Sequence, residues 1–441
     1  MDKPWRTIAV RGLGALCSVL VYSAPQAALA QASDLGPFLG SPIPLTADHG
    51  RNVSVSERPR PESDPIGIHL GGFTAFPSIT VGLAQSSNVF ASPRNPKGDA
   101  YLSIEPLMKL TSNWATNALQ ISGGGSFRRY AKTSLKNESS YFGGVNGRLD
   151  IDRDSAVDGT ALIRRAYQAQ SSSSAPGSAR RSVSYMQTAG LLRGYRQFGP
   201  VRVTLVTDVN KFDFNDLHQS NRPTIDQDFR DETVIRGGGR FEYAVGSDAS
   251  VFVEANYADI SHRLKTLGTQ PNRDGNDLTA LGGVTFDLTN LVRVRAGVGY
   301  VRRRLEARTV YRPISGLAYD GRLEYFLSGI TTVSVAASRS IEESITTGSG
   351  GYFSNTRSVR VDHELLRNLI LYGQGEWQHN VFKGIARKDD ILVARGGGDY
   401  AISQGLSVGA NLKFLDRRSR GQLAGDGFKE WLGSVSITIR R

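Results

Sequence analysis

The sequence predicts an all-β protein: a transmembrane, up-and-down antiparallel β-barrel of about eighteen strands. Three observations lead to this fold class. Apolar and polar residues alternate along most of the chain, the connections switch between short and long, and a secretory signal precedes them all. In Val292–Tyr300, for example, valine, alanine and tyrosine fall on one parity, and arginine and glycine on the other. Such a run is typical of a strand with one apolar and one wetted face.

The N-terminus predicts a secretory signal peptide, residues 1–30. Three basic residues precede the apolar stretch Gly12–Tyr22, and small residues follow at positions suited to cleavage after Ala30 or Ala32. The apolar stretch is too short to cross a membrane as a helix. The single cysteine, Cys17, lies inside this signal, so the mature chain is expected to hold no disulfide.

The segment after the signal differs from the remainder of the chain. Residues 31–65 are rich in proline, serine and charge, as in "SERPRPESDP", and show no hydrophobic period. This composition predicts a flexible periplasmic N-terminal extension, although a role as a plug inside a pore is an alternative. The barrel is then expected to cover residues 66–441.

Alternation recurs in about eighteen runs, each near the length that a tilted strand needs to cross a bilayer. These runs are Ser78–Gln85, Tyr101–Leu110, Leu119–Phe127, Tyr141–Ile151, Val157–Tyr167, Ser182–Gln197, Val201–Phe214, Glu232–Val245, Ser250–His262, Asp277–Leu288, Leu291–Arg302, Gly316–Leu327, Thr331–Ile341, Thr356–Leu365, Leu369–Gln378, Asp390–Ile402, Leu406–Arg417 and Trp431–Arg440.

The connections between these runs alternate in length. Short ones such as "DRDS", "GSD" and "LTN" are interleaved with longer polar ones such as "QSSSSAPGSARR", "NDLHQSNRPTID" and "KGIARKD". Short periplasmic turns and longer extracellular loops are typical of outer-membrane barrels, so we expect the protein in a bacterial outer membrane. Because a wetted lumen makes every second residue polar, the chain contains no long apolar run.

Three stretches also resemble a known family. They are "RPRPESDPIGIHLGGFTAFPSITVGLAQSSNVF" (Arg58–Phe90), "GRLEYFLSGITTVSVAASRSIEES" and "DHELLRNLILYGQGEWQHNVFKGIARKDD", and they resemble the outer-membrane β-barrel porin family of type 2 from about Arg58 onward. The resemblance implies a porin-like barrel of about eighteen strands. It also implies, for some members, export of exopolysaccharide together with periplasmic polysaccharide-export proteins.

Strand parity places a set of charged residues on the wetted face, because an arginine on the lipid face would cost about 2–4 kcal/mol at mid-membrane. The candidate pore-lining residues are Arg128, Arg148, Arg202, Arg236, Arg240, Arg293, Arg295, Arg322, Arg360, Arg395, Glu105, Glu242, Glu254, Glu324, Glu376 and Asp399. The same parity adds Lys413, Asp150, Asp208, Asp287, Asp362 and Glu364. Two interpretations stay open: a pore that selects polar or anionic solutes by charge, and cross-strand salt bridges that hold the wall together.

Glycine triplets occur in the middle of three runs, at Gly123–Gly125, Gly237–Gly239 and Gly396–Gly398. They could leave room in the lumen for a bulky polymer. Glycines in strands more often mark curvature or a neighbouring ring that packs against the backbone, and this is the interpretation we favour.

The sequence contains no strong signal for an enzyme. It has no G-x-S-x-G and no H-E-x-x-H motif; "HELL" at His363 lacks the second histidine, and the histidines show no ligand spacing. We therefore expect no catalytic residues, no cofactor and no metal, although a hydrolase site at the outer rim is an alternative. No basic cluster with interleaved aromatics predicts a nucleic-acid partner.

Together these patterns predict an outer-membrane channel for polar or anionic solutes, and the family resemblance implies an exopolysaccharide as the solute. The alternative is a structural or ligand-binding barrel whose lumen is plugged by its loops or its N-terminus. Expected partners are outer-membrane lipid, lipopolysaccharide and the barrel-assembly machinery.

Overall fold

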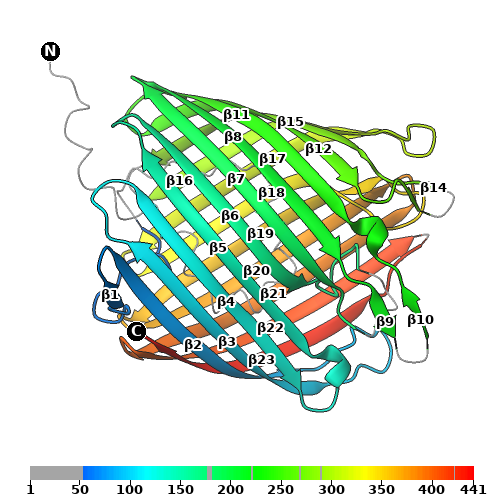
Figure 1. Ribbon diagram of the computed structural model, residues 1–441, viewed down its shortest axis with the longest axis horizontal. Coiled ribbons are helices and arrows are strands. Elements are labelled where there is room, and N and C mark those ends of the chain that lie inside the picture. The colour runs from blue at the N-terminus through cyan, green and yellow to red at the C-terminus, as the bar shows by residue number, and fades with distance from the viewer. Residues whose placement is uncertain (1–52, 176–180, 220–221, 268–269, 289–290, 422) are drawn as a thin grey trace.

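The protein is a closed antiparallel β-barrel of eighteen strands (Figure 1), as the sequence predicted. The computed structural model describes residues 53–441 except 176–180, 220–221, 268–269, 289–290 and 422, so the expected signal peptide lies outside the described residues. Each barrel strand pairs with its neighbours in the chain, and the first, β2, pairs with the last, β23, to close the wall. Closure pairs every strand on both edges, as a lipid environment requires.

The barrel strands coincide in order with the predicted runs. They are β2 (Phe73–Ser86), β3 (Asp99–Ser112), β4 (Ala118–Tyr130), β5 (Glu138–Asp150), β6 (Ser155–Tyr167), β7 (Ser184–Phe198), β8 (Val201–Phe214), β11 (Glu232–Ala244), β12 (Ala249–His262), β15 (Gly275–Leu288), β16 (Val292–Leu305), β17 (Ile314–Ser328), β18 (Thr331–Glu342), β19 (Gly351–Leu366), β20 (Leu369–Lys383), β21 (Arg387–Ser403), β22 (Leu406–Gly421) and β23 (Phe428–Arg440).

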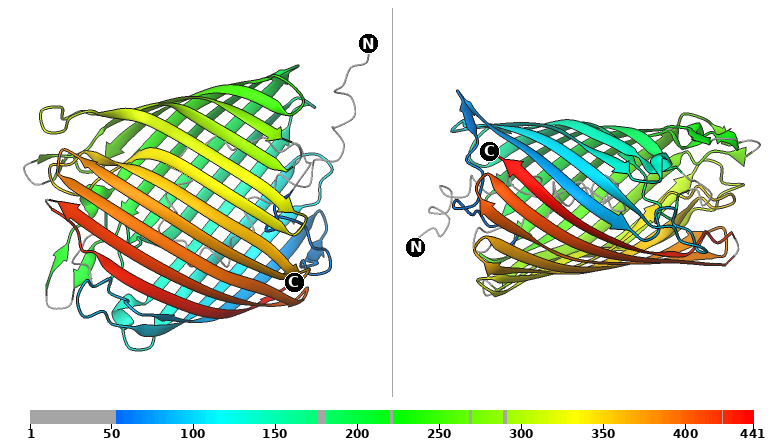
Figure 2. Two further views of the ribbon diagram at one scale, coloured as in Figure 1. Left: turned by 180° about the vertical axis from the view of Figure 1, so that it is seen from behind. Right: turned by 90° about the horizontal axis from the view of Figure 1, so that it is seen from below.

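The two ends of the barrel differ in their connections. Short turns and the start of β2 lie at the same end as the C-terminus (Figure 2), which is the periplasmic end in outer-membrane barrels. The longer loops lie at the other, outer end. Short elements that the sequence did not predict are the strand β1 (Ile68–Leu70), the pairs β9 (Leu217–Gln219) with β10 (Arg222–Ile225) and β13 (Thr266–Leu267) with β14 (Gln270–Pro271), and the 3-10 turns η1 (Ser134–Lys136) and η2 (Asp228–Arg230).

The exterior of the wall is apolar and the interior is polar. Leu83, Val253 and Ile437 point outward and are 61%, 59% and 51% exposed. These side chains form the surface that faces lipid. Among the described residues, no helix is long and apolar enough to cross a membrane.

Several strands extend further at the outer end than the sequence predicted. The run "KGIARKD" was expected to be a loop, but β20 continues to Lys383 and β21 begins at Arg387. Likewise β19 begins at Gly351 instead of Thr356. Beyond the membrane surface both faces of a strand can be polar, so the alternation that marks a strand is lost there.

A segment of the wall folds into the barrel at the outer end. Pairing of β17 with β18 ends at Tyr319 and Arg339, although β18 runs on to Glu342. The segment 339–353, which we call the inner hairpin, crosses the inner side of β15–β17. As a result, the Glu343 carboxylate lies 3.2 Å from the His262 ring on β12.

Packing confirms the inward direction of the inner hairpin. Ile341 and Phe353 share the strand parity of exterior residues such as Val359, but both are almost fully buried. They form one apolar cluster with Leu281 and Val301, which point inward from β15 and β16. Side chains that would otherwise face lipid therefore pack on the inner wall.

The central glycine of each triplet lies against a neighbouring side chain. A Cβ at Gly124 would lie 3.0 Å from the Phe142 ring, and one at Gly397 would lie 3.1 Å from the Tyr372 ring. At Gly238 the neighbour is the amide of Asn256. The glycines therefore make room for side chains of the wall. At Gly124 and Gly397 the neighbour is an aromatic ring, in line with the interpretation favoured from the sequence.

Candidate functional site

The charged residues predicted from parity line the inside of the barrel. The structure places all sixteen on the inner face, opposite the apolar exterior. Arg128, Arg236, Arg240, Arg295, Glu254 and Glu324 are buried in the wall, Arg322 and Asp399 are exposed to the lumen, and the others are partly exposed.

The most buried group joins β11, β12 and β16. The Glu254 carboxylate accepts hydrogen bonds from Arg240 Nε at 3.0 Å and Asn256 Nδ2 at 2.9 Å, and lies 3.5 Å from Arg295 Nη2. Both guanidinium groups also contact the Phe252 ring, 4.8 Å and 5.1 Å from its centroid. This group fixes the wall rather than leaving charge free for a solute.

Most other predicted residues are also paired. The ion pairs are Arg128–Glu138 at 3.3 Å, Arg148–Asp150 at 2.8 Å, Arg148–Asp158 at 3.4 Å, Arg236–Asp208 at 3.6 Å, Arg293–Glu324 at 3.2 Å, Arg322–Glu324 at 2.7 Å and Arg360–Asp362 at 2.7 Å. Glu105, Glu242 and Arg202 have neutral partners in Ser126, Ser250 and Gln197.

A second group lies in one row across four neighbouring strands. Arg360 on β19 is opposite Gln374 on β20, Gln374 is opposite Arg395 on β21, and Arg395 is opposite Lys413 on β22. We call Arg360, Arg395 and Lys413 the basic row. Arg360 is paired with Asp362, but Arg395 and Lys413 form no ion pair with any acidic residue of the described chain. Glu376 on β20 and Asp399 on β21 likewise have no ion-pair partner within the part of the chain that the structure describes.

Two segments that the sequence treated as exterior loops meet inside the outer mouth. Residues 168–175, which we call the inner loop, follow β6. Ser174 Oγ of this loop donates to the Glu343 carbonyl at 2.8 Å, and Ser173 Oγ donates to Asp389 at 2.7 Å. Arg387 of β21 donates to Thr346 Oγ1 of the inner hairpin at 2.9 Å. The two segments and the wall therefore form one network that narrows the mouth.

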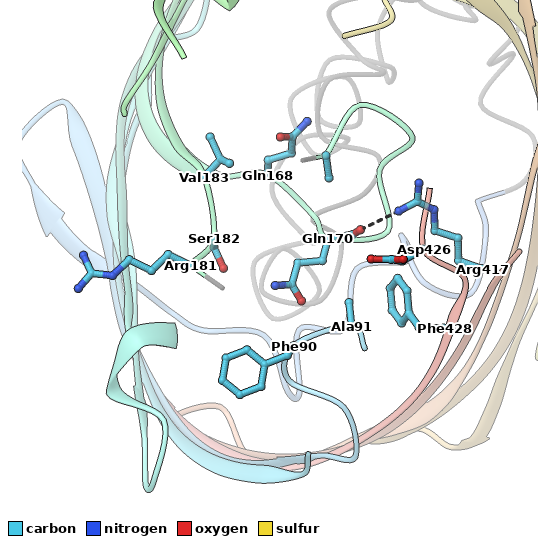
Figure 3. A pocket seen from close by; sticks show the side chains of 11 residues that line it. Phe90, Ala91, Gln168, Gln170, Arg181, Ser182, Val183, Arg417, Asp426 and Phe428 are labelled. Carbon is cyan, nitrogen blue, oxygen red and sulfur yellow. Dashed lines mark hydrogen bonds between the residues drawn. The ribbon is translucent and has the colours of Figure 1, made fainter. Parts of the chain in front are cut away.

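The seam between the inner loop and the wall encloses little space. The cavity in Figure 3 has a volume of about 30 Å³ and is bordered by Phe90, Gln168 and Phe428, and Arg417 donates to the Gln170 carbonyl across it at 3.3 Å. A cavity of this size holds about one water molecule. It is a packing seam and not a solute site.

Residues 53–66, which we call the periplasmic strap, lie against the other end of the barrel. The Val55 amide donates to Thr332 Oγ1 at 3.1 Å, and Arg60 pairs with Glu364 at 3.3 Å. Val55 is fully buried. The strap is the part of the predicted N-terminal extension that the structure describes.

A closed barrel with an apolar exterior and a charged lumen defines the class of outer-membrane channel proteins. Residues 60–441 match the family described as "Putative beta-barrel porin 2", and the chain belongs to this family. The protein is therefore an outer-membrane β-barrel porin. Membership in a porin family indicates a channel and not an enzyme.

Similar solved structures come from Pseudomonas aeruginosa. The outer membrane protein OpdK is 12% identical with a TM-score of 0.45, covering 83% of this chain and 99% of its own. OpdK with vanillate is 10% identical with a TM-score of 0.46 over the same shares, and OpdL is 12% identical with a TM-score of 0.44, over 84% and 99%. No curated protein matches the sequence.

Proposed function

We propose that the protein is a diffusion channel for small polar solutes with a preference for anions. The basic row carries this proposal. Arg395 and Lys413 face each other on adjacent strands, and like charges directly opposite each other destabilise a sheet. A passing anion would relieve this repulsion, so the pair suits a path for negative solutes.

The test is the charge selectivity of the purified channel in a planar bilayer. Under a KCl gradient, the reversal potential is expected to show chloride favoured over potassium. Replacing both Arg395→Gln and Lys413→Gln should move selectivity toward potassium, because two cations are removed from the lumen while the neighbouring carboxylates Glu376 and Asp399 remain. Arg304→Gln is the matched control, since Arg304 is exposed on the exterior parity of β16 and should leave selectivity unchanged. Unaltered selectivity in the double variant would count against the proposal.

A barrel that conducts no ions would favour the alternative function. The inner loop and inner hairpin meet across the outer mouth, and the periplasmic strap covers part of the other end. If the full-length barrel conducts no ions but a variant without residues 343–350 does, the protein is a plugged, ligand-binding barrel. A silent channel in both forms would indicate a structural barrel.

We further propose that the solute is an exopolysaccharide strand that the channel exports. The family resemblance supports this more specific function. A polymer is wider than a small anion, so the inner hairpin would have to leave the lumen before a strand could pass. Block of conductance by added polysaccharide only after deletion of 343–350 would support this role. No block in either form would argue against it.

A further inference from the structure

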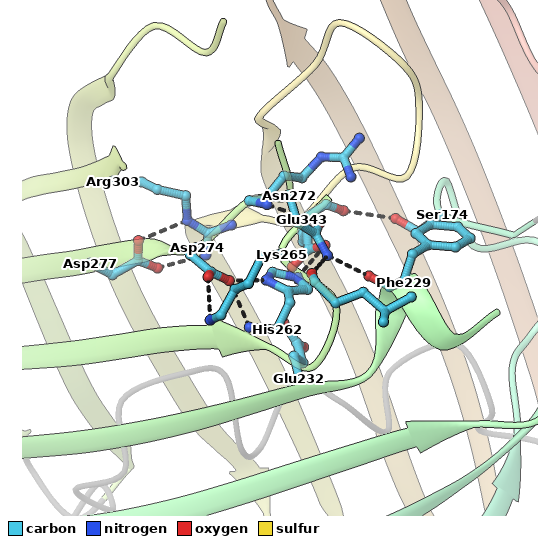
Figure 4. A network of polar contacts seen from close by, with 12 residues as sticks. Ser174, Phe229, Glu232, His262, Lys265, Asn272, Asp274, Asp277, Arg303 and Glu343 are labelled. Carbon is cyan, nitrogen blue, oxygen red and sulfur yellow. Dashed lines mark hydrogen bonds and ion pairs between the residues drawn. The ribbon is translucent and has the colours of Figure 1, made fainter. Parts of the chain in front are cut away.

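The side chains of one histidine and two glutamates meet at the outer mouth, away from the basic row. Glu232 is the first residue of β11 and His262 the last of β12, and they are partners in the sheet register. Glu343 comes from the inner hairpin. His262 Nε2 lies 3.2 Å from Glu343 Oε1 and 3.8 Å from Glu232 Oε2, and one ligand atom of each residue lies within 4.8 Å of the others (Figure 4).

The His262 ring is held in one orientation by its other nitrogen. Nδ1 lies 2.9 Å from Asp274 Oδ1, which also accepts the His262 backbone N–H at 2.7 Å, and Lys265 Nζ lies 2.6 Å from Asp274 Oδ2. Asp274 Oδ1 is thus placed to accept a proton from Nδ1, and the other ring nitrogen, Nε2, faces the two glutamates.

This arrangement requires a cation. A neutral imidazole would point its Nε2 lone pair at two carboxylate oxygens, and the His262 side chain is fully shielded from solvent. Three arginines lie in the same region but have other hydrogen-bond partners: Arg303 pairs with Asp277 at 2.6 Å, Arg273 donates to the Ser349 carbonyl at 3.0 Å, and Arg230 donates to Gln227 Oε1 at 3.0 Å. A histidine oriented by a carboxylate and facing two further carboxylates is a ligand set that divalent transition metals take in proteins.

We propose that Glu232, His262 and Glu343 bind a divalent transition-metal ion of the Zn²⁺ class, which fastens the inner hairpin to the barrel wall. Two ligands belong to adjacent wall strands and the third to the hairpin. The ion thus joins β11 and β12 to the inner hairpin. The hairpin begins at the end of β18, which lies four strands beyond β12 in the sheet. Bound metal holds the hairpin inside the lumen, and its removal frees the hairpin to move.

The first test is binding of Zn²⁺ to the full-length folded protein in detergent, after treatment with a chelator. Calorimetry is expected to show one site that His262→Gln and Glu343→Gln each weaken by about 100-fold or more. Asp274→Asn, which only removes the orienting partner, should weaken it by about 10- to 100-fold. His379→Gln is the matched control, because His379 pairs with Asp390 at 2.6 Å but belongs to no three-ligand group of the described chain.

Two further measurements test the metal site even if one of these variants misfolds. X-ray absorption of the wild-type zinc complex should show one nitrogen and two carboxylate oxygens at about 2.0–2.2 Å. Hydrogen exchange of residues 343–350 should slow with Zn²⁺ in the wild type and in His379→Gln, but not in His262→Gln. No zinc binding by the wild type at pH 8 would identify the cation as a proton and overturn the proposal. Binding that survives loss of both His262 and Glu343 would overturn it equally.

Discussion

Replacing Glu254 by glutamine should destabilise the barrel strongly. The Glu254 side chain has no exposed surface, and it is the acidic partner between Arg240 and Arg295, whose side chains are 3% and 5% exposed. Glutamine keeps the shape and one acceptor but removes the negative charge. The substitution leaves two buried guanidinium groups on the Phe252 ring, with Asp320, 3.8 Å from Arg295 Nη1, as a more distant acidic neighbour.

The expected loss follows from the cost of an uncompensated buried charge. Removing one partner of a buried pair costs about 3–5 kcal/mol. The Asn256 amide also loses a charged acceptor, which makes the upper half of this range the expectation. By contrast, Glu62 and Arg367 form a pair at the periplasmic rim with both side chains largely exposed, and such pairs are worth about 0–1 kcal/mol.

Urea unfolding of barrels inserted in lipid vesicles, followed by tryptophan fluorescence, measures this difference. Glu254→Gln should lower the free energy of unfolding by several kcal/mol, whereas Glu62→Gln should leave it nearly unchanged. Equal effects of the two substitutions would refute the reasoning, because they would show that water in the lumen compensates the charges of the wall.

Two other predictions concern the wall and an outer loop. Gly238→Ala should cost about 1–3 kcal/mol in the same assay, because its Cβ would overlap the buried Asn256 amide, whereas Gly237→Ala, with open space around it, should cost nothing. Burial lowers the pKa of Lys136 from 10.5 to about 8. Between pH 8 and pH 10.5 the unfolded chain therefore binds more protons at this residue than the folded chain does. The free energy of unfolding should accordingly rise with pH from about 8 to 10. Lys136→Met should remove this rise and add about 2–3 kcal/mol to the free energy of unfolding at pH 7. The control is Lys132→Met, because Lys132 is exposed. A rise that persists in Lys136→Met would contradict the assignment to Lys136.

The strands of this barrel could be predicted because lipid and water impose opposite demands on successive residues. Within the membrane most exterior side chains must be apolar, so the run Val201–Phe214 was located with the bounds of β8 itself. Above the membrane that demand ends, and the outer part of β21 from Arg387 to Asp389 reads as a polar loop. Sequence alternation thus locates the membrane-spanning part of each strand rather than the whole strand.

The contents of the lumen could not be predicted in the same way. Ile341 and Phe353 are apolar at exterior parity, and a side chain that packs on the inner wall has the same character as one that faces lipid. Glu232, His262 and Glu343 come from separate segments, and no spacing along the chain relates them. Parity placed Arg395 and Lys413 in the lumen, but only the register shows that they are direct neighbours.

The two ends of the described chain are joined by side-chain contacts as well as by strand pairing. β2 and β23 share register only over Ser78–Ser86, and the strap that precedes β2 reaches past this junction to the strands beyond it. Gln404 donates to the Pro61 carbonyl at 2.8 Å, and Arg440 donates to the Ser63 carbonyl at 2.9 Å. Separating the first strand from the last therefore also requires these contacts to break, so the N-terminal segment acts as a brace that resists unrolling of the cylinder from its periplasmic rim.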